Sequence, residues 1–260
     1  MDGVFKETYK LSACDVDFTD RWKLQSLLEK AQEAANDQCV GLGAGRNEMI
    51  DKYNAAFILA RTYLEIYKYP RNSEQAVIST WPKDGSHHIL VRFFKIEDEN
   101  GELIGRMISH WAVLDLTKRA LVSPDSMGFK MPDTSNIPDL MDMPRRIPCG
   151  YEDPETMEIT ARYSDIDILG HVNNTKYVEW ICDFLGSGFF KQNTICSLDI
   201  KYSREVTEGE PLRLEMVKRD IPECEDGKSF RIFVRGVSEK NGATNFESVL
   251  RAMKTNQVSL

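Results

Sequence analysis

An internal repeat with a spacing of 150 residues limits the folds open to this chain more than any other feature. The segment Asp15-Val16-Asp17-Phe18 recurs as Asp165-Ile166-Asp167-Ile168. Each copy is followed by apolar residues at three- and four-residue steps, which predicts a long helix with one apolar face. Because the two apolar faces fall in register without a gap, we expect two copies of one structural unit.

The two predicted helices bury matching positions. In the first, which covers residues 22 to 40, the apolar positions are Leu24, Leu27, Leu28, Ala31, Ala34 and Ala35. In the second, the positions matching 27, 28, 31, 34 and 35 are Tyr177, Val178, Ile181, Phe184 and Leu185. We expect the helices to end near Gly41 and Gly186, because glycine adopts a left-handed cap at little cost.

Strand-like runs follow each helix. They cover residues 57–67, 76–81, 88–96 and 104–115 in the first half, and 196–202, 212–218, 230–238 and 246–255 in the second. The turn signals between successive runs are Lys83-Asp84-Gly85, Glu99-Asn100-Gly101, Glu225-Asp226-Gly227 and Lys240-Asn241-Gly242. Such turns are typical of antiparallel hairpins. Each half is therefore predicted to be an α+β unit with one long helix laid across an antiparallel sheet.

A proline-rich segment separates the two halves. Residues 120 to 150 hold Pro124, Pro132, Pro138, Pro144 and Pro148. A segment broken up in this way is typical of a linker that crosses the surface. We therefore expect a first domain at 1–125, a linker at 126–150 and a second domain at 151–260. Two like units could pair their sheet edges as a pseudo-dimer, so that a monomer and a homodimer both remain open.

Composition excludes several classes of partner. The formal net charge of -8 argues against nucleic acid or an anionic membrane, since both need a field of Lys and Arg. The first residues lack the apolar run of a signal peptide, and no run of 18 apolar residues offers a membrane span. A cytoplasmic location is the expectation.

No metal or cofactor is expected from sequence motifs. The six cysteines lie far apart, without a CxxC pair or a nearby cluster of histidines. No phosphate-binding glycine motif occurs either. Reduced, mostly buried thiols are the simplest interpretation of the cysteines.

The densest polar cluster of the second half, residues 164 to 177, lies just before the second helix. A helix start presents unpaired backbone N–H groups and about half a positive charge, which suits a negatively charged oxygen forming on a carbonyl group. Asn173 and Asn174 are the candidates for this role. Gly170 would let the chain turn tightly there and bring backbone donors close to a substrate. In a simpler interpretation, the Asp and Asn residues of this cluster only cap the helix.

The two copies differ at this cluster. The first half has Arg21 in place of His171 and Lys23 in place of Asn173. The polar set of the second half therefore exceeds what a shared fold requires, and this favours a site there.

The run Tyr163-Ser164-Asp165-Ile166-Asp167, followed by residues Gly170 to Trp180, resembles the signature of acyl-acyl-carrier-protein thioesterases, the FatA/FatB type of plants and their bacterial relatives. The likeness extends to Trp81 and Trp111 in the first half and to the segment Tyr202-Ser203-Arg204-Glu205-Val206 in the second. The resemblance implies a tandem (double) hotdog fold. It also implies hydrolysis of fatty acyl-carrier-protein thioesters in fatty acid biosynthesis, with acyl carrier protein as the partner.

Carried over by position, the family's catalytic aspartate, histidine and glutamate fall on Asp167, His171 and Glu205. Two positions depart from the plant pattern: Leu169 replaces an Asn, and Val206 replaces a Cys. The missing Cys argues against a thiol nucleophile, and the missing Asn means that one contact to substrate or water is made otherwise or not at all. From the residues alone, His171 could be a packed histidine at a helix entry and Glu205 a solvated surface acid.

The implied chemistry is attack by water on the acyl carbonyl, with Glu205 as general base and His171 beside it. Attack by a carboxylate through an anhydride stays open. We expect the first half to bind the acyl chain under its helix, near Leu27, Ala31 and Ala34, although ordinary core packing explains these residues equally well.

Three rival functions remain. An acyl-coenzyme A thioesterase and a dehydratase use the same fold, and a non-catalytic acyl-binding protein is the rival from another class. Chain-length preference is beyond the sequence.

Overall fold

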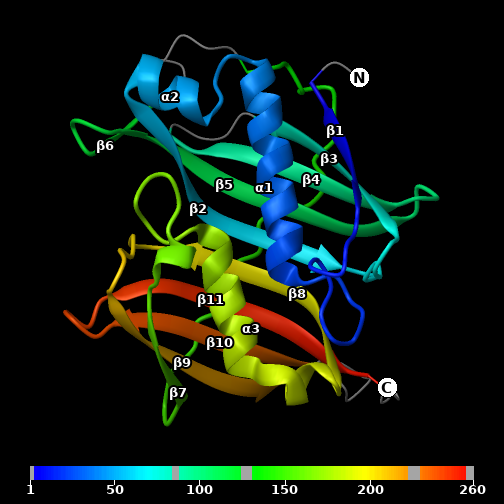
Figure 1. The fold of residues 1–260 in the computed structure, drawn as a ribbon, viewed down its shortest axis with the longest axis vertical. Coiled ribbons are helices and arrows are strands. Elements are labelled where there is room, and N and C mark those ends of the chain that lie inside the picture. The colour runs from blue at the N-terminus through cyan, green and yellow to red at the C-terminus, as the bar shows by residue number, and fades with distance from the viewer. Residues whose placement is uncertain (1–2, 84–87, 124–130, 222–228, 256–260) are drawn as a thin grey trace. The chain divides into compact units, whose positions relative to one another are not determined.

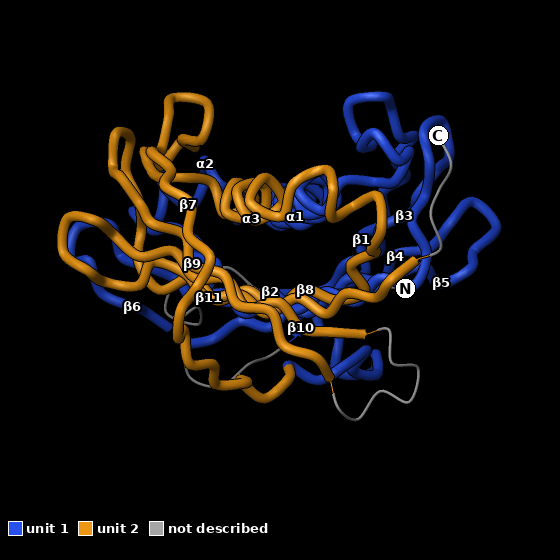
Figure 2. Tube along the Cα trace, turned by 90° about the horizontal axis from the view of Figure 1, so that it is seen from below, with its two compact units in different colours: residues 1–143 blue, residues 144–260 orange. Residues whose placement is uncertain are grey.

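The computed structural model describes residues 3–83, 88–123, 131–221 and 229–255. The chain divides into two compact units, unit 1 at Met1–Met143 and unit 2 at Pro144–Leu260, so the division falls inside the proline-rich segment (Figures 1 and 2). Several expectations lie outside the described residues: the domain boundary at 125, Pro124, Cys224 and the turns at 84–85 and 225–227.

Unit 1 is an antiparallel sheet with a long helix on one face (Figure 1). Its elements are β1 (Phe5–Lys10), α1 (Leu24–Gly41), α2 (Arg46–Tyr53), β2 (Ala55–Ile66), β3 (Gln75–Lys83), β4 (Leu90–Asp98), β5 (Leu103–Asp115) and β6 (Ala120–Val122). The strands pair in the order β1-β3-β4-β5-β2, and β6 pairs with β5.

Unit 2 repeats this arrangement. Its elements are β7 (Glu155–Thr160), a single 3-10 turn at Tyr163–Asp165, α3 (Asn174–Phe190), β8 (Asn193–Tyr202), β9 (Pro211–Asp220), β10 (Ser229–Ser238) and β11 (Thr244–Lys254). The strands pair antiparallel in the order β7-β9-β10-β11-β8. This is the order of unit 1, strand for strand, so the repeat in the sequence is a repeat of topology.

In each unit the apolar face of the long helix is buried. Leu27 of α1 is 3% exposed, and Ala31 and Ala34 are fully buried. On α3, Tyr177 is 3% exposed, and Val178 and Ile181 are fully buried. Burying one large apolar side chain contributes about 1.5–3 kcal/mol, so these faces hold helix and sheet together. As the structure stands, the three acyl-pocket candidates fill the core of unit 1.

Four helices and strands escaped the sequence analysis: β1, α2, the three-residue β6 and β7. The strands β1 and β7 were missed because their charged and polar residues alternate with few apolar ones at the edge of a sheet. The helix α2 was missed because only Met49 of its eight residues is buried. The helix end expected near Gly186 is confirmed in part: the regular helix breaks there, where Gly186 has a φ of 73°, and a further helical segment continues across the kink to Phe190.

The first part of the expected linker packs against unit 1. Residues 131–150 form no helix or strand. Met141 is 9% exposed and contacts Trp81, Phe93 and Ile108. The Arg106 guanidinium donates a hydrogen bond to the backbone oxygen of Leu140 over 3.0 Å. The segment therefore adds to the core of unit 1 before the chain enters unit 2.

The carboxylate of Asp15 holds the turn in front of α1. It accepts hydrogen bonds from the Ser12 N–H at 2.8 Å and the Ser26 hydroxyl at 2.7 Å, and it pairs with Lys30 at 2.9 Å. Burial alone would raise the pKa of Asp15, but the hydrogen bonds from Ser12, Ser26 and Lys30 outweigh it and hold the pKa well below its ordinary value.

We expect Asp15→Asn to lower the free energy of unfolding of unit 1 by about 1–3 kcal/mol at pH 7, because charge-assisted hydrogen bonds are lost. Since the pKa of Asp15 is depressed in the folded state, its contribution is complete above the ordinary carboxyl pKa of about 3.9 and is lost as the pH falls below it. Urea unfolding of both proteins from pH 7 to pH 3 measures this. The exposed Asp51→Asn is the control, and a difference that grows on acidification would contradict the assignment.

Candidate active site

The same turn precedes the long helix in both units. In unit 2 the Asp167 N–H donates to the oxygen of His171, and the Asn173 N–H donates to the oxygen of Asp165, each over 2.8 Å. The matching bonds of unit 1, also 2.8 Å, join Asp17 to Arg21 and Lys23 to Asp15. The turn is thus closed by backbone bonds and does not depend on which side chains it carries.

A second backbone bond joins this turn to the chain that leaves the sheet. The Val172 N–H donates to the oxygen of Val206 over 2.8 Å, and in unit 1 the Trp22 N–H donates to the oxygen of Pro70 over 3.0 Å. Glu205, which precedes Val206, therefore corresponds to Tyr69 in unit 1. No carboxylate occupies the position of Glu205 in unit 1.

The structure brings His171 and Glu205 together. The Nε2 atom of His171 lies 3.2 Å from a carboxylate oxygen of Glu205. The two side chains are 26% and 35% exposed, so solvent reaches both of them. A carboxylate and an imidazole in contact can take up and pass on a proton, which is what general acid–base catalysis requires.

Asp167 lies on the same turn and helps to shape it. Its side chain accepts a hydrogen bond from the Leu169 N–H over 2.8 Å, as Asp17 does from the Thr19 N–H over 2.7 Å. Gly170 has a φ of 81°, a left-handed conformation that suits glycine, and its N–H donates to the oxygen of Asp167 over 3.0 Å. Asp167 therefore has a turn-forming role in both units, and any catalytic role comes in addition.

Tyr177, on the buried face of α3, feels the charges of the site. Burial first, and then the carboxylates of Glu210, Asp167 and Glu205, raise the pKa of Tyr177 well above its ordinary value. The sequence analysis counted Tyr177 only as a core residue of the helix face.

The two asparagines at the helix start have different roles. Asn173 is the N-cap, and its side-chain oxygen accepts from the N–H and the hydroxyl of Thr175 over 2.9 and 2.8 Å. Asn174 is the first residue of α3, so its N–H has no partner inside the helix. The backbone oxygen of Asn174 accepts a hydrogen bond from the Tyr202 hydroxyl over 3.1 Å. The oxygen of Asn173 is thus used by the cap that the simpler interpretation expected, and the N–H of Asn174 is one of the donors that the helix itself leaves unpaired.

Asn245, which the sequence analysis did not single out, also contacts the site. Its side-chain N–H group donates to the backbone oxygen of Glu205 over 3.3 Å. The one signal in the sequence that could have marked it is that unit 1 has an apolar residue, Ile104, at the matching position.

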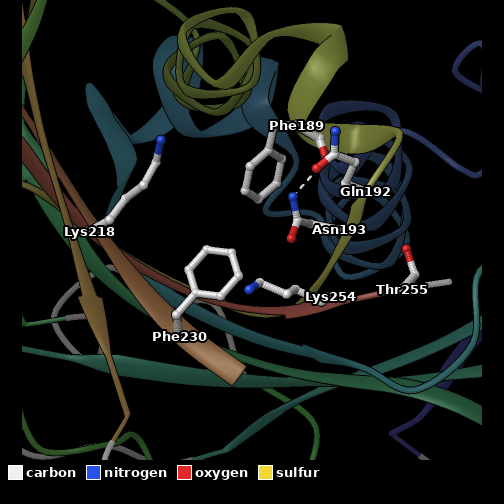
Figure 3. A pocket seen from close by; sticks show the side chains of 7 residues that line it. All are labelled: Phe189, Gln192, Asn193, Lys218, Phe230, Lys254 and Thr255. Atoms are coloured by element: carbon white, nitrogen blue, oxygen red, sulfur yellow. Dashed lines mark hydrogen bonds between the residues drawn. The ribbon is translucent and has the colours of Figure 1, made fainter. Parts of the chain in front are cut away.

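A hollow of about 400 Å³ lies at the other end of α3 (Figure 3). The rings of Phe189 and Phe230 face it with their centroids 6.2 Å apart, and Lys218 and Lys254 stand on its other sides. Because a helix rises about 1.5 Å per residue, the two ends of α3 are roughly 20 Å apart. This hollow therefore does not contain the His171–Glu205 pair.

Neither a metal-binding cluster nor a membrane-spanning helix occurs among the described residues. No group of three or more His, Cys, Asp or Glu side chains among them is placed to hold a metal ion. No helix in that part of the chain is long and apolar enough to cross a membrane.

Known proteins resemble this chain over most of its length. A solved acyl-ACP thioesterase from Bacteroides thetaiotaomicron aligns with a TM-score of 0.79 at 24% identity, over 96% of this chain and 97% of that one. A 12:0-ACP thioesterase from Umbellularia californica aligns with a TM-score of 0.77 at 19% identity, over 97% and 94%. At these identities the likeness shows the fold, which is a hotdog-like α+β fold.

A chloroplastic acyl-[acyl-carrier-protein] hydrolase of Cuphea viscosissima is 23% identical over 216 residues, which are 78% of this chain and 52% of that protein. The chain thus spans about half the length of the curated relatives it matches.

The two halves of the repeat match two domains of a single family, in the same order. Residues 2–125 match the acyl-ACP thioesterase N-terminal domain, and residues 150–248 match the acyl-ACP thioesterase C-terminal domain. With both domains present and together covering most of its length, the chain belongs to the acyl-ACP thioesterase family.

Proposed function

We propose that this chain hydrolyses fatty acyl-carrier-protein thioesters, releasing a free fatty acid and the carrier thiol, as a step of fatty acid biosynthesis. The observation that carries the proposal is the contact between His171 and Glu205 over 3.2 Å, at the open N-terminus of α3. The family membership supplies the substrate class.

In the proposed reaction, the carbonyl oxygen of the thioester points toward the start of α3, where the N–H of Asn174 and the helix dipole stabilise the developing negative charge. Glu205 takes a proton from a water molecule, and the water oxygen bonds to the carbonyl carbon. The C–S bond then breaks, and the thiolate receives a proton from the Glu205–His171 pair. One well-placed donor at an oxyanion is worth about 3 kcal/mol of barrier in other enzymes.

The polar partners of the pair suit this scheme. Asp167 shapes the turn that carries His171, through the backbone bond from the Asp167 N–H to the oxygen of His171 and the bond that its side chain accepts from the Leu169 N–H. We assign catalysis to His171 and Glu205, and the placement of the site to Asp167.

The finer fold and the domain roles are part of the same proposal. Each unit is a hotdog domain, and the chain is a tandem repeat in which unit 2 is catalytic and unit 1 binds the acyl chain. The identical strand order of the two units supports the tandem repeat. The division of roles is supported by the polar side chains of unit 2, which occupy the positions that Arg21 and Tyr69 have in the repeat of unit 1. A cytoplasmic location remains a prediction.

The carrier is proposed to be a protein because apolar side chains stand exposed beside the site. Ile168, inside the turn that carries His171, is 65% exposed, and Tyr163 is 85% exposed. Exposed apolar side chains that lie together on a surface are typical of sites that bind another protein. A coenzyme A thioester offers a nucleotide in place of a protein surface, and it would gain less from these side chains.

We expect Glu205→Gln and His171→Ala each to lower the kcat for acyl-carrier-protein hydrolysis by about 10²- to 10⁴-fold, the range of a lost general acid or base. Release of free thiol from carrier protein loaded with C8 to C18 chains measures this. Substrate consumed without thiol release would point to the dehydratase, and tight binding without turnover to a non-catalytic acyl-binding protein.

Unit 1 offers matched controls for these two variants. Arg21→Ala and Tyr69→Phe change the residues that occupy the positions of His171 and Glu205, and both should keep near wild-type kcat. If Glu205→Gln and His171→Ala also keep wild-type turnover, their assigned roles are wrong.

We expect Ile168→Ser to lower kcat/KM for an acyl-carrier protein about five- to tenfold, in line with the loss of one apolar interface contact, and to leave kcat/KM for the same acyl chain on coenzyme A unchanged. Phe18→Ser, which changes the matching 46% exposed residue of unit 1, is the control. Equal loss on both carriers would show that Ile168 does not contact the carrier protein.

A further inference from the structure

Asn245 is the residue that ties the sheet to the segment carrying Glu205. It lies near the start of β11, and its backbone oxygen accepts from the N–H groups of Ser203 and Arg204 over 2.8 and 3.1 Å. Its side-chain N–H group donates to the backbone oxygen of Glu205 over 3.3 Å. One buried residue, 2% exposed, therefore holds three consecutive residues, of which the third is the proposed general base.

The orientation of the Asn245 amide is fixed by its partner. A backbone oxygen only accepts hydrogen bonds, so the nitrogen of the amide must face Glu205 and its oxygen must point elsewhere. That oxygen is buried and has no hydrogen-bond partner among the described residues. A buried acceptor without a donor costs free energy, so the amide is an unfavourable choice for packing alone.

Unit 1 shows that the fold does not need this amide. At the matching position, the backbone oxygen of Ile104 accepts from the N–H groups of Tyr67 and Lys68 over 2.9 and 3.3 Å. Ile104 is 2% exposed and apolar. The same pair of backbone hydrogen bonds therefore forms when the side chain is apolar. The amide side chain occurs in the unit that has His171 and Glu205.

Both residues occupy a β-bulge. In unit 2 the pairing shifts so that Gly236 faces Phe246 and Val237 faces Thr244, which leaves Asn245 as the extra residue. In unit 1 a shift at the same place leaves Ile104 as the extra residue. Bulges redirect side chains and often lie next to active sites. Here the bulge directs Asn245 toward the backbone of Glu205.

We propose that Asn245 is a positioning residue for the hydrolysis, which holds the backbone of Glu205 through its amide so that the carboxylate stays on His171. The inference rests on the proposed function. It gives Asn245 no contact with the substrate; its whole effect passes through Glu205. A base displaced by about 1 Å can cost up to about 100-fold in rate, so a single backbone hydrogen bond at this place is sufficient to matter.

The test is Asn245→Ile, which installs the residue that unit 1 carries at the matching position. We expect kcat for acyl-carrier protein to fall about 10- to 100-fold with KM unchanged. The midpoint of urea unfolding should stay the same or rise, because a buried unpaired oxygen is removed. A merely structural residue would show the reverse: a lower unfolding midpoint and an unchanged kcat.

The double variant Asn245→Ile with Glu205→Gln tests whether the effect of Asn245 on kcat passes through Glu205. If Asn245 acts through Glu205, the double variant turns over no more slowly than Glu205→Gln alone, because there is no base left to position. Additive losses would overturn the inference. The control Ile104→Asn, which places the amide in unit 1, should lower the unfolding midpoint and leave kcat unchanged.

These outcomes separate the inference from the function on which it rests. If wild-type protein releases thiol and Glu205→Gln does not, full activity of Asn245→Ile overturns the positioning role alone. If wild-type protein releases no thiol from any acyl-carrier protein or acyl-coenzyme A, the proposed function fails, and the inference fails with it.

Discussion

The backbone bond from Val172 to Val206 is the constraint on which the site depends. It joins the turn in front of α3 to the chain that leaves β8, over 2.8 Å, and so brings together segments that are far apart along the chain. Closing such a loop costs conformational entropy, and this cost grows slowly with the length of the loop. The contacts of the sheet and the helix offset it, because they fix both ends of the loop. Since the bond uses only backbone atoms, the side chains on either side of it are free to carry chemistry. His171 precedes one end and Glu205 precedes the other, and for this reason they meet.

Unit 1 has the same bond, from Trp22 to Pro70, with other side chains around it. Arg21 and Tyr69 take the places of His171 and Glu205, and Ile104 takes the place of Asn245. The two units therefore separate what the fold requires from what the chemistry requires. Both aspartates of the turn are shared by the two units, and Asp17 and Asp167 each accept a bond from the turn backbone. For His171, Glu205 and Asn245, unit 1 thus has the same backbone arrangement with a different side chain at the matching position.

Most of the fold could be predicted from the sequence because its main signals are local. The repeat, the two long helices and eight strands follow from apolar periodicity and turn residues, and the structure confirms them within a few residues at each end. The edge strands β1 and β7 carry too few apolar residues to show a period, although they start 150 residues apart, as the two long helices do. Glu205 is different in kind. It lies among exposed polar residues, and nothing local marks it, so that only the resemblance to a family singled it out.

Asn245 shows most clearly what a local pattern leaves out. The strand was expected to begin at Phe246, and so Asn245 fell outside it. In the structure β11 begins at Thr244, and the bulge at Asn245 lets the strand take in one extra residue. A bulge changes which way one side chain points, and the alternation of apolar residues does not record it. The sequence also cannot show that the amide oxygen of Asn245 is unpaired. Only the folded structure shows that this oxygen is buried and has no hydrogen-bond donor beside it among the described residues. The two copies of a repeat make such a residue visible, because the apolar copy shows what stability alone would choose.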